Sequence, residues 1–289
     1  MSRRLGVCTW SLRPGSPLDL AERVRETGCR AVQLALDPIR RGAWPEDGTV
    51  AVLEENGIDI LSGMMEMAGE DYSSLDSIRR TGGVRPDETW PENLANARKN
   101  AEIARRLGID LVTFHAGFLP HERGDRERPV LMQRLRDMAD VFAEGGVRVA
   151  FETGQETAET LLDALDELDH PNIGVNFDPA NMVLYDMGDP IEAMRRLAPY
   201  IAQAHVKDAS PTLVAGEWGA EEVCGHGAVD WDGFFGVLRE HLPDCDLLIE
   251  REQGESRVAD IAEARRFVLE RMGDQIQEIN AGDEPGGMG

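Results

Sequence analysis

The sequence is poor in lysine, which occurs only at Lys99 and Lys207, and it has no excess of positive charge. Its 30 lysine and arginine residues stand against 54 aspartate and glutamate residues, which gives a formal net charge of −24. A protein that binds nucleic acid needs a basic surface to neutralise the phosphates. The composition therefore argues against a nucleic-acid partner. Whether the acidity reflects a salt-rich habitat is left open.

Long apolar runs are also lacking. No stretch approaches the roughly 18–20 apolar residues that a membrane helix needs, although hydrophobic residues make up 42% of the chain. The N-terminal MSRRLGVCTWSL has neither the apolar run nor the small-residue cleavage site of a secretion signal. The four cysteines form no CxxC pair, so we expect reduced thiols and no zinc ribbon. We predict a cytoplasmic protein with no membrane partner.

What the sequence does contain is a regular alternation of short apolar runs with helical patterns. The runs are 5–9, 31–36, 58–63, 110–115, 147–152, 173–178, 201–207 and 246–250. Parallel strands require crossover helices, so the alternation predicts one α/β domain, a (β/α)8 TIM barrel over residues 1–273. An open doubly wound sheet is the alternative, but the turn after the first run, TWSLRPGS, lacks the G-x-G-x-x-G of such folds.

Three further segments complete the expected organisation. Residues 64–91 and 208–229 are longer than ordinary connections, which is typical of loops that cover a site. The last residues, 274–289, are rich in glycine and turn formers, and we predict that they are disordered.

Ionisable side chains stand at or near the ends of four consecutive predicted strands. They are Glu152, Asp178, His205 and Glu250. In a TIM barrel the strand ends face the mouth of the active site, and three carboxylates with one imidazole would repel one another without a cation. This set suits Mn²⁺, Mg²⁺, Co²⁺ or Zn²⁺. Singly, each carboxylate would more often cap a helix or pair with arginine, but the four together favour a metal site.

Other side chains are expected at the same mouth. Trp10 is either a wall for a sugar ring or part of the core. We expect His115 to contact the substrate and Lys207 to hold hydroxyls or a developing oxyanion. Asn181 can hydrogen-bond a sugar hydroxyl. Arg251 follows the eighth strand and is a candidate for a substrate phosphate, although no obvious basic cluster surrounds it.

The segments FETG, NFDPAN, HVKDA, GHGAVDW and LLIERE occur in this order. Together they resemble the xylose isomerase-like barrels, in particular the sugar phosphate isomerase/epimerase and inosose dehydratase group. The resemblance implies a site for Mn²⁺ or a similar ion, with Glu152, Asp178, His205 and Glu250 as its ligands. It also implies that the two glutamates act on opposite faces of the substrate. One departure is Asn181, where such epimerases usually have a histidine; asparagine cannot carry a proton at neutral pH.

The expected activity is isomerisation or epimerisation of a small keto sugar or sugar phosphate. Glu152 would take a proton from the carbon next to the carbonyl, the cation would stabilise the enediolate, and Glu250 would return a proton. Loss of a hydroxyl or other leaving group from that enediolate would instead make the protein a dehydratase or lyase on an inosose or keto-glycoside. The sequence does not separate these outcomes.

Two other hypotheses are weaker. A DNA-repair endonuclease, suggested by kinship in fold, is disfavoured by the acidic charge. A non-catalytic sugar-binding barrel is disfavoured because both glutamates are present beside the other ligands. The expected partner is a small sugar or polyol, and the oligomeric state is left open.

Overall fold

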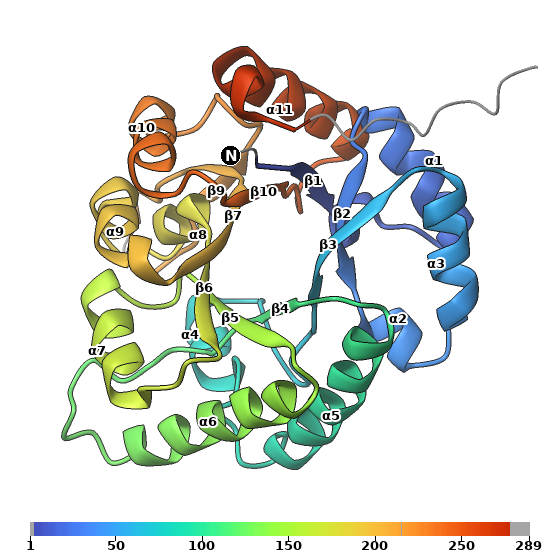
Figure 1. Cartoon of the computed structure of the whole chain (residues 1–289). Coiled ribbons are helices and arrows are strands. Elements are labelled where there is room, and N and C mark those ends of the chain that lie inside the picture. Colours follow the sequence, from blue (N-terminus) through green and yellow to red (C-terminus); the bar gives the residue numbers. More distant parts are fainter. Residues whose placement is uncertain (1–2, 215, 278–289) are drawn as a thin grey trace, which may run out of the picture.

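A closed barrel of eight parallel strands forms the centre of the protein in the computed structural model, which describes residues 3–214 and 216–277 (Figure 1). The barrel closes because β1 pairs with both β2 and β10. The predicted TIM barrel is thereby confirmed, and an open sheet is excluded. The strands are β1 Leu5–Cys8, β2 Ala31–Ala35, β3 Asp59–Met64, β4 Leu111–Phe114, β5 Arg148–Glu152, β6 Ile173–Phe177, β7 Ile201–Val206 and β10 Asp246–Ile249.

Helices surround the barrel as an outer ring (Figure 1). The ring consists of α1 Pro17–Thr27, α3 Glu46–Glu55, α5 Trp90–Arg106, α6 Arg128–Glu144, α7 Ala158–Leu168, α9 Pro190–Leu197, α10 Trp231–His241 and α11 Arg257–Met272. Local sequence explains their starts: the Ser16 side chain accepts from the Asp19 amide at α1, and Thr157 accepts from the Thr160 amide at α7. Buried apolar residues recur three or four positions apart in α7, so one face of that helix packs on the barrel.

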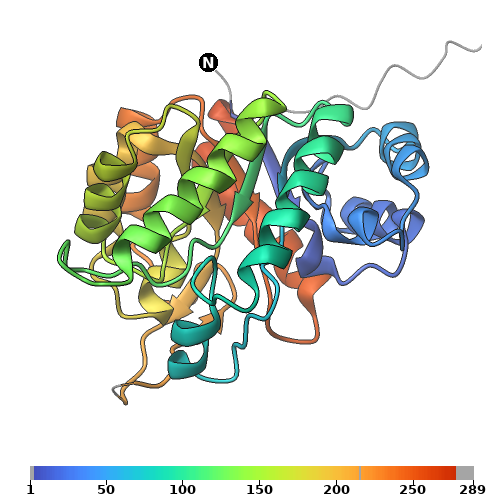
Figure 2. The ribbon, with the colours of Figure 1, turned by 90° about the horizontal axis from the view of Figure 1, so that it is seen from below.

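The two long segments carry small elements of their own. Residues 64–91 include α4 Leu75–Thr81, and residues 208–229 include an antiparallel hairpin of β8 Asp208–Ser210 and β9 Ala220–Glu222. Figure 2 shows α4 and the hairpin segment projecting on the same side of the barrel. Shorter elements are α2 Asp37–Arg40, α8 Pro179–Leu184, η1 Thr9–Leu12, η2 Ala198–Tyr200 and η3 Gly273–Gln275.

Hydrogen-bonded polar side chains, all buried, run through the barrel interior instead of a purely apolar filling. Gln203 Nε2 donates to Asn176 Oδ1 at 3.1 Å, and Gln33 Nε2 donates to Thr113 Oγ1 at 2.9 Å. Both pairs contact His205, which lies between them. Buried amides are stable when they are bonded in this way. This series of hydrogen bonds supports the strand ends from inside the barrel.

The beginning of the predicted tail packs against the N-terminus. Ile276 forms a parallel bridge with Arg3, and the Gln277 amide donates to the Arg3 carbonyl at 2.7 Å. The rest of that tail, residues 278–289, lies outside the described residues. Within the part of the chain that the structure describes, no helix combines the length and the apolar character needed to cross a membrane.

Candidate active site

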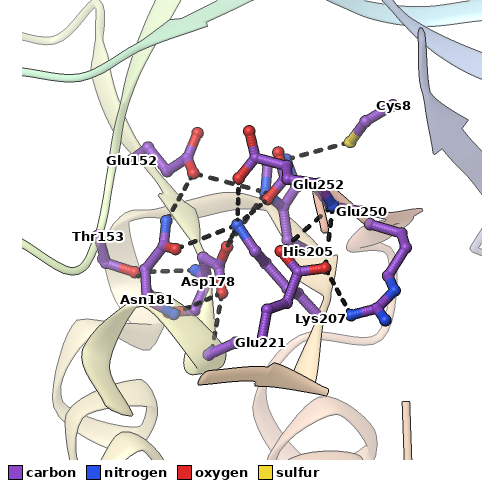
Figure 3. A network of polar contacts seen from close by, with 12 residues as sticks. Cys8, Glu152, Thr153, Asp178, Asn181, His205, Lys207, Glu221, Glu250 and Glu252 are labelled. Atoms are coloured by element: carbon purple, nitrogen blue, oxygen red, sulfur yellow. Dashed lines mark hydrogen bonds and ion pairs between the residues drawn. The ribbon is translucent and has the colours of Figure 1, made fainter. Parts of the chain in front are cut away.

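The four predicted ligand side chains come together at the carboxyl ends of their strands (Figure 3). They are Glu152 on β5, Asp178 directly after β6, His205 on β7 and Glu250 directly after β10. One ligand atom from each lies within 4.8 Å of the others. His205 Nδ1 is 3.7 Å from Glu152 Oε1, 3.6 Å from Asp178 Oδ2 and 3.4 Å from Glu250 Oε2. All four residues are buried.

Two atoms that face the middle of this cluster have no hydrogen-bond partner among the described residues. They are Asp178 Oδ2 and His205 Nδ1. Lys207 Nζ lies 3.8 Å from Asp178 Oδ2, beyond hydrogen-bond distance. A buried carboxylate oxygen without a partner is strongly disfavoured, whereas a divalent cation would satisfy it together with the imidazole nitrogen. The donor set of carboxylate oxygens and one imidazole therefore fits such a cation.

Asp178 uses its two oxygens for different tasks. Oδ1 accepts from the Ala180 and Asn181 amides at 2.8 and 3.0 Å and so caps α8, which begins at Pro179. Oδ2 faces the cluster. Thr153 fixes the backbone, because its Oγ1 accepts from the Asp178 amide at 2.8 Å. The helix-cap and metal-site interpretations of this carboxylate are thus compatible in one residue.

Gln33 orients the imidazole of His205. Gln33 Oε1 lies 2.9 Å from His205 Nε2 and can only accept, so Nε2 carries the hydrogen and Nδ1 presents its lone pair to the carboxylates. Asn176 Nδ2, 3.0 Å from the same nitrogen, directs a hydrogen to Glu152 Oε2 at 3.4 Å. Cys8 also lies near His205 and Glu250. Burial raises the pKa of its thiol to about 12, so Cys8 is a poor ligand beside the carboxylates.

Asn181 and Lys207 connect the two glutamates of the cluster. Asn181 Nδ2 donates to Glu152 Oε1 at 2.8 Å, and its Oδ1 accepts from Lys207 Nζ at 3.2 Å. Lys207 also donates to Glu250 Oε2 at 2.8 Å and to Glu252 Oε2 at 2.7 Å. Both predicted substrate contacts therefore lie at the cluster, where they hold the glutamates in place.

The two glutamates have unequal electrostatic environments. Burial raises the pKa of Glu152 to about 7, against the lowering effect of His115 and His205. Burial acts on Glu250 in the same direction, but Lys207 and His205 outweigh it and hold the pKa of Glu250 well below its usual range. Two carboxyl groups whose environments separate their pKa values are typical of acid–base sites.

The remaining predicted residues divide into two groups. Trp10 Nε1 donates to Glu250 Oε1 at 2.6 Å, and His115 Nε2 lies 3.9 Å from Glu152 Oε1, so both belong to the mouth. Arg251 does not. Its guanidinium binds Glu221 and Asp260, each at 2.9 Å. Two cavities lie beside the cluster, and Arg251 lines neither of them. Arg251 therefore connects the loop after β10 to β9 and α11.

Asp208, next to Lys207, binds several donors of the segment after β9, a role that was not predicted from the sequence. Its Oδ2 accepts from the Gly225 and Gly227 amides at 2.8 and 3.0 Å and from Trp231 Nε1 at 2.9 Å. Its Oδ1 accepts from the Val229 amide at 3.2 Å. A Cβ atom on Gly227 would lie 2.2 Å from Asp208 Oδ1, which explains the glycine in GHGAVDW. The contacts hold the segment after β9 against the end of β7.

With this geometry in place, comparison with known proteins identifies the family. The profile of the family described as xylose isomerase-like TIM barrel matches residues 21–271. The chain belongs to the xylose isomerase-like TIM barrel family. A xylose isomerase domain protein from Planctomyces limnophilus is similar in structure, with a TM-score of 0.83, 29% identity, and coverage of 95% of this chain and 98% of that one.

Curated relatives of this family member are dehydratases. A 3-dehydroshikimate dehydratase of Bacillus anthracis is 33% identical over 90 residues, which are 29% of this chain and 31% of the relative. An inosose dehydratase of Clostridium botulinum is 25% identical over 152 residues, 47% of this chain and 51% of the relative. The chain thus spans about half or less of the length of the curated relatives it matches.

Two more solved structures are similar in fold alone, both at 16% identity. A D-allulose 3-epimerase from Methylomonas sp., in complex with D-allulose, has a TM-score of 0.69 over 93% of this chain and 97% of that one. A protein named IOLI, with a bound zinc atom, has a TM-score of 0.73 over 95% of this chain and all of that one. Sugar epimerases and dehydratases both occur among the neighbours of this chain.

Proposed function

We propose that this protein is a divalent-metal-dependent isomerase or epimerase of a keto sugar or sugar phosphate. The reaction removes a proton from the carbon next to the carbonyl and then returns a proton to the substrate. The observation that carries the proposal is the buried cluster of three carboxylates and one imidazole, in which Asp178 Oδ2 and His205 Nδ1 have no hydrogen-bond partner within the described chain. The neighbouring D-allulose 3-epimerase acts on a sugar of this class, which agrees with the proposal.

Four residues would hold the cation: Glu152, Asp178, His205 and Glu250. When bound, the cation, for which we propose Mn²⁺, supplies a Lewis acid that stabilises negative charge developing on the substrate oxygens. The rest of the chemistry belongs to side chains of this chain, and it requires a base, an acid and groups that fix the sugar.

Glu152 is the proposed base. Asn181 Nδ2 holds its Oε1 at 2.8 Å, which fixes the carboxylate for removal of the proton next to the carbonyl. Glu250 is the proposed partner on the other face, where Trp10 and Lys207 hold its two oxygens at 2.6 and 2.8 Å. Return of the proton to the same carbon from the other face gives an epimer, and return to the neighbouring carbon gives an isomer.

His115 and Lys207 are the proposed contacts for sugar hydroxyls. His115 Nδ1 is buried and has no partner among the described residues, so a substrate hydroxyl would satisfy it. Lys207 Nζ already lies among three oxygens of Glu250, Glu252 and Asn181. An ammonium in this place stabilises negative charge that develops on a substrate oxygen nearby.

A dehydratase is the second candidate, because both curated relatives above carry that activity. The first step would be the same proton removal by Glu152. The electron pair then expels a hydroxyl from the next carbon, and Lys207 Nζ is the cation available to protonate it as it leaves as water.

Incubation in D₂O with Mn²⁺ and a panel of ketoses, keto-phosphates and inososes tests the proposal. We expect deuterium next to the carbonyl, and no incorporation by Glu152→Gln or Glu250→Gln. A product of unchanged mass, apart from deuterium, identifies an isomerase or epimerase, and a product lighter by one water identifies a dehydratase.

Metal content of each variant is measured in parallel, because both glutamates also belong to the proposed ligand set. A Glu152→Gln protein that retains the cation but has lost exchange supports the base role. Exchange that persists in both variants contradicts the mechanism.

A further inference from the structure

Two cavities lie beside the cluster of the four proposed ligands, and Tyr72, His115 and Glu252 line both. The first has a volume of about 430 Å³ and the second of about 400 Å³. Pockets of roughly 300–1,000 Å³ hold drug-sized ligands, so either cavity alone has room for a ring-sized group. A ligand at the cluster can therefore extend in two directions.

The second cavity, here called the polar lobe, has many hydrogen-bonding groups. It is lined by Asn181, Lys207, Glu221, Glu252 and Gln253, with Tyr185 and Trp218 as aromatic walls. Polar groups on an aromatic wall are the combination that binds a polyol, because its hydroxyls need partners and its C–H faces pack on rings. The polar lobe therefore suits the sugar.

The first cavity, here called the apolar lobe, has a different lining. Its exposed lining surface is mainly apolar, and the apolar side chains include Trp10, Ala35, Trp44, Met64, Met65 and Phe114. Several of its polar groups are engaged with the protein itself, although exposed Arg13 is not among them. Arg41 pairs with Glu66 at 2.8 Å, and the oxygens of Glu70 accept from the Gly83 amide at 2.9 Å and the Tyr72 hydroxyl at 3.0 Å.

Two further polar groups of the apolar lobe are engaged in the same way. Asp37 pairs with Arg40 and accepts from the Glu66 amide at 2.7 Å. The indole N–H of Trp10 is bonded to Glu250. With these groups engaged, the surface that the lobe offers a ligand is mainly apolar, and burial of an apolar ring there is favourable.

We propose that the substrate is a keto sugar that carries an apolar ring as a substituent, with the sugar in the polar lobe and the ring in the apolar lobe. The inference rests on the proposed function, because the ketone and its neighbouring hydroxyl must lie at the cluster between the lobes. An anionic substituent such as phosphate is disfavoured in the apolar lobe, since six carboxylates line it against two arginines, Arg13 and Arg41.

Three small α-hydroxyketones test this without knowledge of the sugar. Dihydroxyacetone, dihydroxyacetone phosphate and 2-hydroxyacetophenone share the chelating group and differ in what they place beside it. The measurement is deuterium exchange in D₂O with Mn²⁺-loaded protein, together with the dissociation constant of each compound. We expect the phenyl compound to bind at least tenfold more tightly than dihydroxyacetone and the phosphate to gain nothing.

Variants localise the effect. Gln33 points into the barrel, so Ala35, two residues later on β2, points to the same side at the mouth. Ala35→Leu fills the apolar lobe, and Met64→Ala removes part of its wall; both should reduce the preference for the phenyl compound by several-fold. Leu18→Ala, on the exposed side of α1 and outside both lobes, is the matched control and should keep it.

The outcomes separate the two proposals. Exchange of dihydroxyacetone without any preference for the phenyl compound overturns the apolar lobe as a subsite and leaves the proposed function intact. Tight binding of the phenyl compound that Ala35→Leu weakens, with no exchange of any probe, supports the subsite and overturns the function. A preference for the phosphate, or a phenyl preference unchanged in both Ala35→Leu and Met64→Ala, refutes the inference.

Discussion

Asp178→Asn separates the two tasks of one carboxylate. The asparagine keeps an oxygen for the Ala180 and Asn181 amides, so α8 retains its cap, because asparagine and aspartate are equivalent caps. Its NH₂ group replaces Oδ2 and cannot bind a cation. Asp189 provides the matched control: it also precedes a proline, and its Oδ1 caps α9 through the Ile191 and Glu192 amides at 2.8 and 2.9 Å. Asp189 is exposed and outside the cluster.

The magnitudes follow from burial and linkage. Without metal, replacing a buried carboxylate oxygen that lacks a hydrogen-bond partner should leave Asp178→Asn as stable as the wild type or more stable, by up to about 1–3 kcal/mol. At a cation concentration of about 100 times Kd, binding adds about 2.7 kcal/mol to the wild type. For a domain of this size that corresponds to a rise in Tm of roughly 5–10 °C.

Thermal unfolding after chelation and again with Mn²⁺ is the assay. The wild type and Asp189→Asn should gain Tm with Mn²⁺, and Asp178→Asn should gain little, so that the order of wild type and Asp178→Asn reverses between the two conditions. A Tm of Asp178→Asn that rises with Mn²⁺ as much as that of the wild type would refute the assignment of Oδ2 to the cation.

Two further predictions concern stability. Asp208→Asn places an NH₂ group against the Gly225, Gly227 and Trp231 donors. At about 1–3 kcal/mol for each lost buried bond, the free energy of unfolding in urea should fall by at least about 3 kcal/mol. A fall below about 1 kcal/mol would contradict the role of Asp208. Burial raises the pKa of the Glu156 carboxyl from 4.5 to about 8. The folded state therefore binds this proton more tightly than the unfolded state; the resulting stability is fully present below about pH 4.5 and is lost as the pH rises through 8. Glu156→Gln should therefore raise Tm at pH 8.5 relative to the wild type but not at pH 4.5, and an equal effect at both pH values would contradict this.

The barrel was predictable because alternation of apolar runs and helices has few other solutions. The same periodicity placed Glu152, Asp178, His205 and Glu250 at strand ends that a closed parallel barrel brings together. The short α8 and the hairpin β8–β9 were not predicted, since they depend on caps and side-chain contacts such as those of Asp208.

The contrast between Arg251 and Glu252 shows what the sequence analysis overlooked. Side chains alternate along an extended segment, so the residue after Glu250 points away from the site and the second one points back. Arg251 accordingly binds Glu221 and Asp260, and Glu252 binds Lys207. The same alternation predicts that Asn176, two residues before Asp178, faces the interior. Tyr72, on a long loop, has no comparable signal.

The hydrogen-bonded polar side chains inside the barrel limit how protons reach and leave the cluster. Gln203, Asn176, Gln33 and Thr113 form the floor beneath His205, and none of these side chains gains or loses a proton near neutral pH. These side chains are hydrogen-bonded to one another or to His205, but they offer no titratable group that could carry a proton away from the cluster. Within the described residues, the mouth is therefore the route by which Glu152 and Glu250 exchange protons with water. While a substrate fills the mouth this route is closed, so Glu152 and Glu250 exchange their protons with water before the substrate enters or after the product leaves.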